Sequence, residues 1–157
     1  IPTVNNENLK NQFISPSTII NSVKRYDSLR SPQFVESDQY MAIAAKIYSL
    51  SREDSTLVTS GLMQVLHPLT DLLPPTYELS WLRYLYVKVN FDENKLIEII
   101  KKHRPTLIVT TDWMPGEADM SAIIDKIDLY EKVVVVPVNL KKNYGWKSGT
   151  IYRLKDF

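Results

Sequence analysis

Three residues of this sequence have the types needed for nucleophilic catalysis, and they lie far apart along the chain. Ser60, His67 and Asp112 could form a Ser/His/Asp triad, in which the histidine removes the proton of the serine hydroxyl. The sequence contains no G-x-S-x-G segment, which in other enzymes exposes a nucleophilic serine on a turn between a strand and a helix. We therefore predict no catalytic residue in this chain.

Metal and cofactor sites lack their usual residues. The chain has no cysteine, and its two histidines, His67 and His103, have no second ligand at a spacing such as H-x-x-x-H. Gly61 is a single glycine where a dinucleotide-binding loop needs three, and no Gly-Lys-Ser phosphate loop occurs. We predict neither a metal site nor a bound cofactor.

The segment at 111–116, Thr-Asp-Trp-Met-Pro-Gly, resembles the phosphoacceptor segment of response-regulator receiver domains. Asp112 precedes Pro115 by three positions, whereas that family requires four, and Thr111 occupies the acceptor position. The residues that follow the first predicted strand also lack the acidic pair that binds Mg²⁺. Without these carboxylates phosphoryl transfer has no charge neutralisation, so we expect a structural or ligand-facing loop.

Helices and loops can be placed from spacing and from prolines. Apolar side chains recur at helical spacing from Asp38, after Asp92 and from Met120, and Asp92 can cap its helix. A shorter helix at 62–66 is expected to end at His67-Pro68. The two prolines of 72–78 remove backbone donors, so this segment is predicted to be a loop.

Strands alternate with these helices, which predicts an α/β fold with a doubly wound, mainly parallel sheet of about five strands. The segments 56–59, 83–89, 106–111 and 132–138 are expected to be neighbouring parallel strands. The last strand, 149–154, follows a connection too short for a helical crossover and should pair antiparallel at an edge. Residues 1–37 are expected to form an irregular lead-in to one α/β domain at 38–157.

Open α/β sheets bind ligands at the carboxyl ends of their strands. The loops after the first and third predicted strands share that edge and contain the five residues that we predict to bind a ligand. These residues are Ser60, Gly61, Asp112, Trp113 and Glu117. An aromatic ring with carboxylates and hydroxyls is able to stack on a sugar ring and bind its hydroxyl groups.

Two further surfaces are candidates for contact with other molecules. Aromatic residues that fall in predicted loops or at strand starts can stack on sugars or anchor a membrane interface, or they can pack partly in the core. They are Tyr77, Trp81, Trp113, Tyr144 and Trp146. The segment 141–155 carries five basic residues, which fit a solvated hairpin or a phosphate contact.

The composition excludes several classes of protein. The chain has 157 residues, with 19 Lys and Arg against 18 Asp and Glu, so its net charge is +1 and no global field attracts nucleic acid. No apolar run is long enough to span a membrane. Because the sequence begins at Ile1 without a signal-peptide pattern, we expect it to be a piece of a longer parent protein.

A wider resemblance covers 40–157 and is carried by a rhythm of short segments. In chain order these are SREDSTLVTSG at 51–61, LLPPT at 72–76, RYL at 83–85, LIEII at 96–100 and RPTLIV at 104–109. Together they resemble the extracytoplasmic C-terminal domain of polytopic GT-C membrane glycosyltransferases of the protein mannosyltransferase and aminoarabinose transferase type.

The resemblance implies an accessory role at the extracytoplasmic face of the cell membrane. Enzymes of that family use polyprenyl-phosphate sugars, and their catalytic acidic residues lie in a loop between membrane spans, so no catalytic residue carries over to this chain. The implied partners are the transmembrane portion of the parent chain and a saccharide or polyprenyl-phosphate headgroup, with no nucleic acid. The alternatives are a receiver-like or other α/β signalling module and a small stand-alone enzyme.

Overall fold

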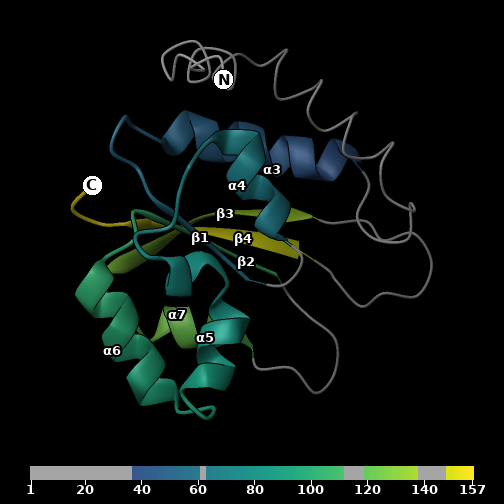
Figure 1. The fold of residues 1–157 in the computed structure, drawn as a ribbon. Helices are drawn as coiled ribbons and strands as arrows, with labels where there is room; N and C mark the ends of the chain where they lie inside the picture. The colour runs from purple at the N-terminus through teal and green to yellow at the C-terminus, as the bar shows by residue number, and fades with distance from the viewer. Residues whose placement is uncertain (1–36, 61–62, 112–118, 138–147) are drawn as a thin grey trace, which may run out of the picture.

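The computed structural model describes residues 37–60, 63–111, 119–137 and 148–157. It shows an α/β fold, with one sheet between two layers of helices (Figure 1). The elements, in chain order, are α3 (Ser37–Leu50), β1 (Leu57–Thr59), the 3₁₀ helix η1 (Met63–Val65), α4 (Leu66–Thr70), the 3₁₀ helix η2 (Tyr77–Ser80), α5 (Leu82–Lys88), α6 (Glu93–His103), β2 (Leu107–Thr111), α7 (Met120–Asp125), β3 (Tyr130–Pro137) and β4 (Ser148–Leu154).

The sheet is mixed, and its strand order is β1-β2-β4-β3. β1 and β2 are parallel, with Leu57 opposite Leu107, whereas β4 runs antiparallel to both of its neighbours. Tyr152 of β4 therefore lies between Ile108 of β2 and Lys132 of β3. The register between β3 and β4 shifts after Lys132, which marks a β-bulge in β3.

Successive strand residues point to opposite faces of the sheet, which divides the core in two. Leu57 and Leu107 pack with α3, η1 and α4 on one face. Val58, Ile108 and Tyr152 pack with α5, α6 and α7 on the other face. Figure 1 shows α3 and α4 on one side of the strands and the other three helices on the opposite side. Both faces of the sheet are thus covered by helices.

The helices predicted at the start of the domain, after Asp92 and from Met120 are confirmed. In α6, Asp92 is the N-cap residue, and its Oδ1 accepts a hydrogen bond from the Lys95 amide at 3.1 Å. The same helix ends at Arg104, whose φ of 45° is left-handed and whose amide donates to the carbonyl of Ile100. These local signals are visible in the sequence, so the boundaries of α6 were predictable.

The strand predicted at 83–89 is wrong, because this segment forms the helix α5. Its aromatic and β-branched residues favour a strand when they are taken one by one. The burial follows a helical period instead: Leu82 and Leu85 are buried, whereas Tyr84 and Val87 are 52% and 49% exposed. Burial of the Leu82 and Leu85 stripe against the sheet outweighs the weak intrinsic strand preference of the segment.

The end of α5 has the geometry of a Schellman motif. The Phe91 amide donates to the Tyr86 carbonyl and the Asn90 amide donates to the Val87 carbonyl. Asn90 has a φ of 55°, which is the left-handed conformation that this motif requires. The Tyr86 and Phe91 rings contact edge to face, with centroids 5.5 Å apart. This hydrophobic contact commonly accompanies the motif and closes the helix.

The predicted sheet also needs two corrections in its order. β4 is antiparallel as expected, but it lies inside the sheet between β2 and β3 and is not an edge strand. The strand expected at 132–138 is present as β3, although it pairs with β4 and not with a parallel neighbour. The described sheet therefore has four strands, and its pairings are mostly antiparallel. Strand order depends on packing between distant segments, which local sequence patterns do not encode.

Two smaller expectations concern the ends of elements. α4 continues through His67 and Pro68 as far as Thr70, so the helix does not end where it was expected to end. Pro68 lies in the first turn, where backbone amides have no acceptor within the helix, and proline is tolerated there. The irregular lead-in predicted at 1–37 lies outside the described residues except for Ser37, which begins α3.

Candidate functional site

The carboxyl ends of β1 and β2 lie side by side, because these strands are parallel neighbours. Ser60 directly follows β1, and its amide donates to the Val109 carbonyl of β2 at 2.9 Å. The Ser60 residue is 2% exposed. The structure thus places Ser60 at the predicted edge. Gly61, Asp112, Trp113 and Glu117 lie outside the described residues.

A second polar group lies beside the last residue of β1. The Thr59 hydroxyl donates to the Ser80 carbonyl at 3.1 Å and lies 3.4 Å from His67 Nε2. His67 Nε2 is also 3.2 Å from the Ser80 carbonyl, and Nδ1 is 3.0 Å from the Leu72 carbonyl. The His67 ring therefore links α4 to β1, to η2 and to the loop that ends at η2.

This geometry does not support the triad considered from the sequence. His67 contacts Thr59, the residue before Ser60, and its other ring nitrogen lies against a backbone carbonyl in place of a carboxylate. Thr59 is completely buried, so no substrate reaches its hydroxyl. The contacts of His67 are those of a residue that fixes η2 and α4 against β1.

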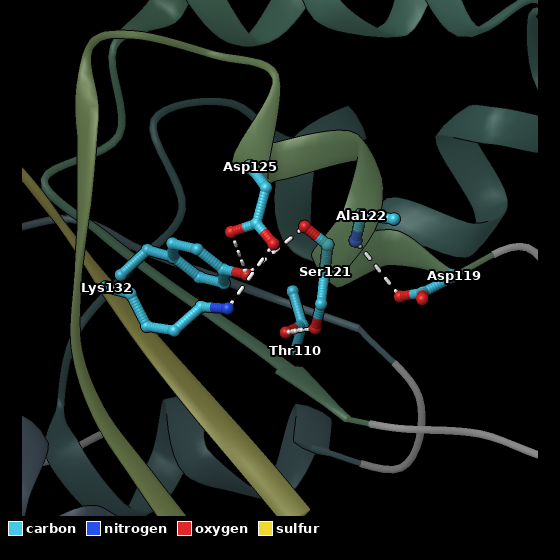
Figure 2. A network of polar contacts seen from close by, with 7 residues as sticks. Thr110, Asp119, Ser121, Ala122, Asp125 and Lys132 are labelled. Atoms are coloured by element: carbon cyan, nitrogen blue, oxygen red, sulfur yellow. Dashed lines mark hydrogen bonds and ion pairs between the residues drawn. The ribbon is translucent and has the colours of Figure 1, made fainter.

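Buried hydroxyl groups also lie at the carboxyl end of β2. Thr110 Oγ1 and Ser121 Oγ are 2.5 Å apart and join β2 to α7, as Figure 2 shows. Asp119 is the N-cap of α7, and its Oδ1 accepts a hydrogen bond from the Ala122 amide at 3.0 Å. These contacts fix both attachment points of the connection 112–118, which contains three of the predicted ligand-binding residues.

The same cluster continues through Tyr152 to Asp125 and Lys132, two residues that Figure 2 labels. The Tyr152 hydroxyl lies 2.9 Å from Asp125 Oδ1 and 3.2 Å from the Ser121 carbonyl, and it can donate to either. Lys132 Nζ is 3.3 Å from Asp125 Oδ2 and lies 5.6 Å from the centre of the Tyr152 ring. Burial, followed by the hydrogen bond to Asp125, raises the pKa of the Tyr152 hydroxyl far above its ordinary value. The hydroxyl is therefore a stable donor at neutral pH.

Sequence reasoning missed Thr110, Ser121 and Tyr152 as members of one network. Thr110 carries the clearest signal, because it is a polar residue at the end of an otherwise apolar buried strand. Ser121 and Tyr152 carry no comparable signal, since their meeting depends on β4 lying next to β2. The network was therefore not predictable without the strand order.

The aromatic and basic candidate residues differ in their exposure and in their contacts. Tyr77 is 87% exposed, whereas Trp81 is half-buried beside β1. Arg153 is paired across the strands with Glu131, its Nε lying 2.9 Å from Glu131 Oε1. Lys155 is exposed, and the other three basic residues of the 141–155 segment lie outside the described residues. Trp113, Tyr144 and Trp146 also lie outside them.

In the described parts of the chain, no three His, Asp or Glu side chains come together in an arrangement that could hold a metal ion. No helix in those parts has both the length and the apolar character needed to cross a lipid bilayer.

Comparison with known proteins gives no relative: no protein-family model, no curated protein and no solved structure matches the chain significantly. The resemblance to membrane glycosyltransferase domains therefore depends only on the short sequence segments quoted above. A functional hypothesis for this chain therefore starts from the residues at the carboxyl ends of β1 and β2.

Proposed function

We propose that this chain is an accessory α/β domain of a membrane glycosyltransferase that uses a polyprenyl-phosphate sugar. In this proposal the domain lies at the extracytoplasmic face of the membrane, against the transmembrane portion of its parent chain. It contributes no catalytic residue and helps to bind the acceptor or its saccharide.

The observation that carries this proposal is the group of hydroxyls where the parallel strands β1 and β2 end. Ser60 follows β1, and the Thr110 and Ser121 pair joins the end of β2 to α7. These hydroxyls are buried, and those of Thr110 and Ser121 bond each other, so in this proposal they fix the edge of the sheet while the residues predicted in the loops after the two strands bind the sugar. The position agrees with the general rule that open α/β sheets bind ligands at the carboxyl ends of their strands.

The direct test is an NMR titration of this 157-residue chain, followed through its amide shifts. The probes are a panel of methyl glycosides, with dimethyl phosphate as a separate probe for the headgroup. We expect shifts at Ser60, at Thr110 and at Ser121, with dissociation constants on the order of millimolar because an open edge leaves most of a ligand in water.

The matched variants are Ser60→Ala and Ser49→Ala. Ser60→Ala should weaken glycoside binding about fivefold, which corresponds to the loss of one hydrogen bond. Ser49 lies on α3 and bonds only its own helix, so Ser49→Ala should leave binding unchanged. Shifts confined to 148–157 would place the contact on the basic C-terminal segment instead. The absence of any shift with every glycoside would refute saccharide binding.

A further inference from the structure

The exposed apolar side chains of this protein are concentrated in one stretch of the chain. Among the described residues six large hydrophobic side chains are exposed, and five of them lie between positions 73 and 91. Three of these five belong to α5 and the turn that follows it: Tyr84, Val87 and Phe91 are 52%, 49% and 64% exposed. Exposed apolar groups that gather on one surface are typical of contact sites with other molecules, whereas single ones are normal.

These three residues, which we call the α5 patch, lie on the side of the helix that faces water. Tyr84 and Val87 are three positions apart and are therefore neighbours on the helix surface, opposite to the buried leucines of α5. Phe91 follows the end of the helix, where its ring contacts the Tyr86 ring edge to face. Figure 1 shows α5 on the side of the sheet away from α3.

The backbone at Phe91 is strained. Its φ of 59° is left-handed, and a bulky side chain is an outlier in this conformation, which glycine or asparagine adopts at lower cost. A phenylalanine that is exposed as well as strained contributes little to the stability of the free chain. Strain of this kind persists where a side chain held in a fixed position serves binding.

The charges around the α5 patch are mainly basic. Residues 82–104, which form α5, α6 and their connection, carry six basic and three acidic side chains, whereas the remainder of the chain has more acidic than basic residues. α5 itself contains Arg83 and Lys88 and no acidic residue. Lys88 pairs with Glu78, but both side chains are about half exposed, so water screens this pair. The surface is thus complementary to anionic groups.

We propose that the α5 patch docks on the anionic surface of a lipid membrane, with Val87 and Phe91 entering the boundary between headgroups and acyl chains. This inference rests on the proposed function, which places the domain at a membrane, and it specifies the face that meets the lipid. Tyrosine is enriched at membrane interfaces because its ring is apolar and its hydroxyl is polar, which suits Tyr84.

A lipid surface fits this patch better than a second copy of the chain. A symmetric dimer would place the same patch of both copies face to face, and the basic residues around it would repel one another. The outer face of a helix is also convex, and lipid adapts to a convex surface without a preformed groove.

Co-sedimentation of the 157-residue chain with lipid vesicles tests the docking. The vesicles are phosphatidylcholine with about 30% phosphatidylglycerol, and vesicles of phosphatidylcholine alone are the comparison. Phe91→Asn and Val87→Ser alter the patch. Tyr48→Ser is the matched control, because Tyr48 is the sixth exposed large hydrophobic side chain and lies on α3, across the sheet from α5.

We expect the unmodified chain to bind the anionic vesicles with half-saturation on the order of 1 mM lipid, and to bind the neutral ones more weakly. Phe91→Asn should weaken this binding about tenfold and Val87→Ser about threefold, because less apolar surface leaves water. Raising the salt from about 0.1 M to about 0.5 M should weaken it about threefold. Tyr48→Ser should leave it unchanged. The Tm of Phe91→Asn should be unchanged or higher, because asparagine relieves the strain.

The results that would overturn the proposal are distinct from those that bear on saccharide binding. Absence of vesicle binding, equal binding to neutral and anionic vesicles, or equal losses in Phe91→Asn and Tyr48→Ser would each overturn it. A dimer in analytical ultracentrifugation that Phe91→Asn dissociates would make a second copy the occupant. A Tm of Phe91→Asn lowered by more than about 3 °C would show that Phe91 serves the fold. Glycoside shifts without vesicle binding would leave the saccharide role standing, and vesicle binding without glycoside shifts would refute that role alone.

Discussion

Replacing Tyr152 by phenylalanine tests the buried network that joins β4 to α7. Tyr152 is 1% exposed, and its hydroxyl can donate to the Asp125 carboxylate or to the Ser121 carbonyl. A hydroxyl has one proton, so it donates to one of these two acceptors at a time. Tyr152→Phe therefore removes one donated hydrogen bond. Bonds to charged groups contribute about 1.5–3 kcal/mol, and water can partly replace this one because the Asp125 side chain is 48% exposed. We expect the free energy of unfolding at pH 7 to fall by about 1–2 kcal/mol.

The same substitution has a predictable pH dependence. The pKa of Tyr152 in the folded chain is raised above its ordinary value of about 10, so the contribution of the hydroxyl is fully present below pH 10. Above pH 10 the unfolded chain loses this proton while the folded chain keeps it. The free energy of unfolding then falls by about 1.4 kcal/mol per pH unit, an effect that phenylalanine cannot show. The advantage of the unmodified chain should therefore disappear near pH 11.

Denaturant unfolding followed by circular dichroism at pH 7, 9, 10 and 11 measures this difference. Tyr84→Phe is the control, because Tyr84 is 52% exposed and the substitution should change stability by less than about 0.5 kcal/mol. A difference between the unmodified chain and Tyr152→Phe that stays constant up to pH 11 would refute the reasoning. It would show that Tyr152 ionises at the same pH in the folded and unfolded chain.

Two further predictions concern α5 and its end, both measured by denaturant unfolding. Leu85→Ala should cost about 2–4 kcal/mol and Val87→Ala less than about 0.5 kcal/mol, because only Leu85 is buried; equal losses would indicate a strand with both residues on one face. Asn90→Val should cost about 1–2 kcal/mol, because a β-branched residue is strained at the φ of 55° found there, whereas Asn90→Gly should be neutral or stabilising. A less stable Asn90→Gly than Asn90→Val would contradict the Schellman geometry.

Much of the local structure was predictable because its signals are local. Apolar spacing and the Asp92 cap define α6, and the continuous apolar runs define β2 and β3. The segment of α5 was wrongly predicted to be a strand. Its aromatic and β-branched residues fit a strand, whereas its Leu82 and Leu85 stripe fits a helix. Asn90 followed by Phe91 was the signal that could have decided between them, since it matches a helix end.

The candidate site was predictable only in its position. Ser60 lies at the carboxyl end of β1 as expected, because the chain there reads as a strand followed by a turn. The meeting of Thr110, Ser121 and Tyr152 required β4 to lie beside β2, and no local pattern indicates that order. His67 contacts Thr59 and not Ser60, the serine of the triad that was considered and not predicted, which reflects the alternation of side chains along β1.

The central place of β4 has a consequence for how the chain acquires its structure during synthesis. Within the described sheet, β3 pairs only with β4, and β2 pairs with β1 and β4. β4 is synthesised last of the four strands. β2 and β3 therefore emerge from the ribosome before the strand that lies between them. Until Leu154 leaves the ribosomal tunnel, β3 has no hydrogen-bonding neighbour in the sheet and its valine-rich segment is exposed to other nascent chains. Folding of this sheet is therefore expected to begin only after β4 has left the ribosomal tunnel.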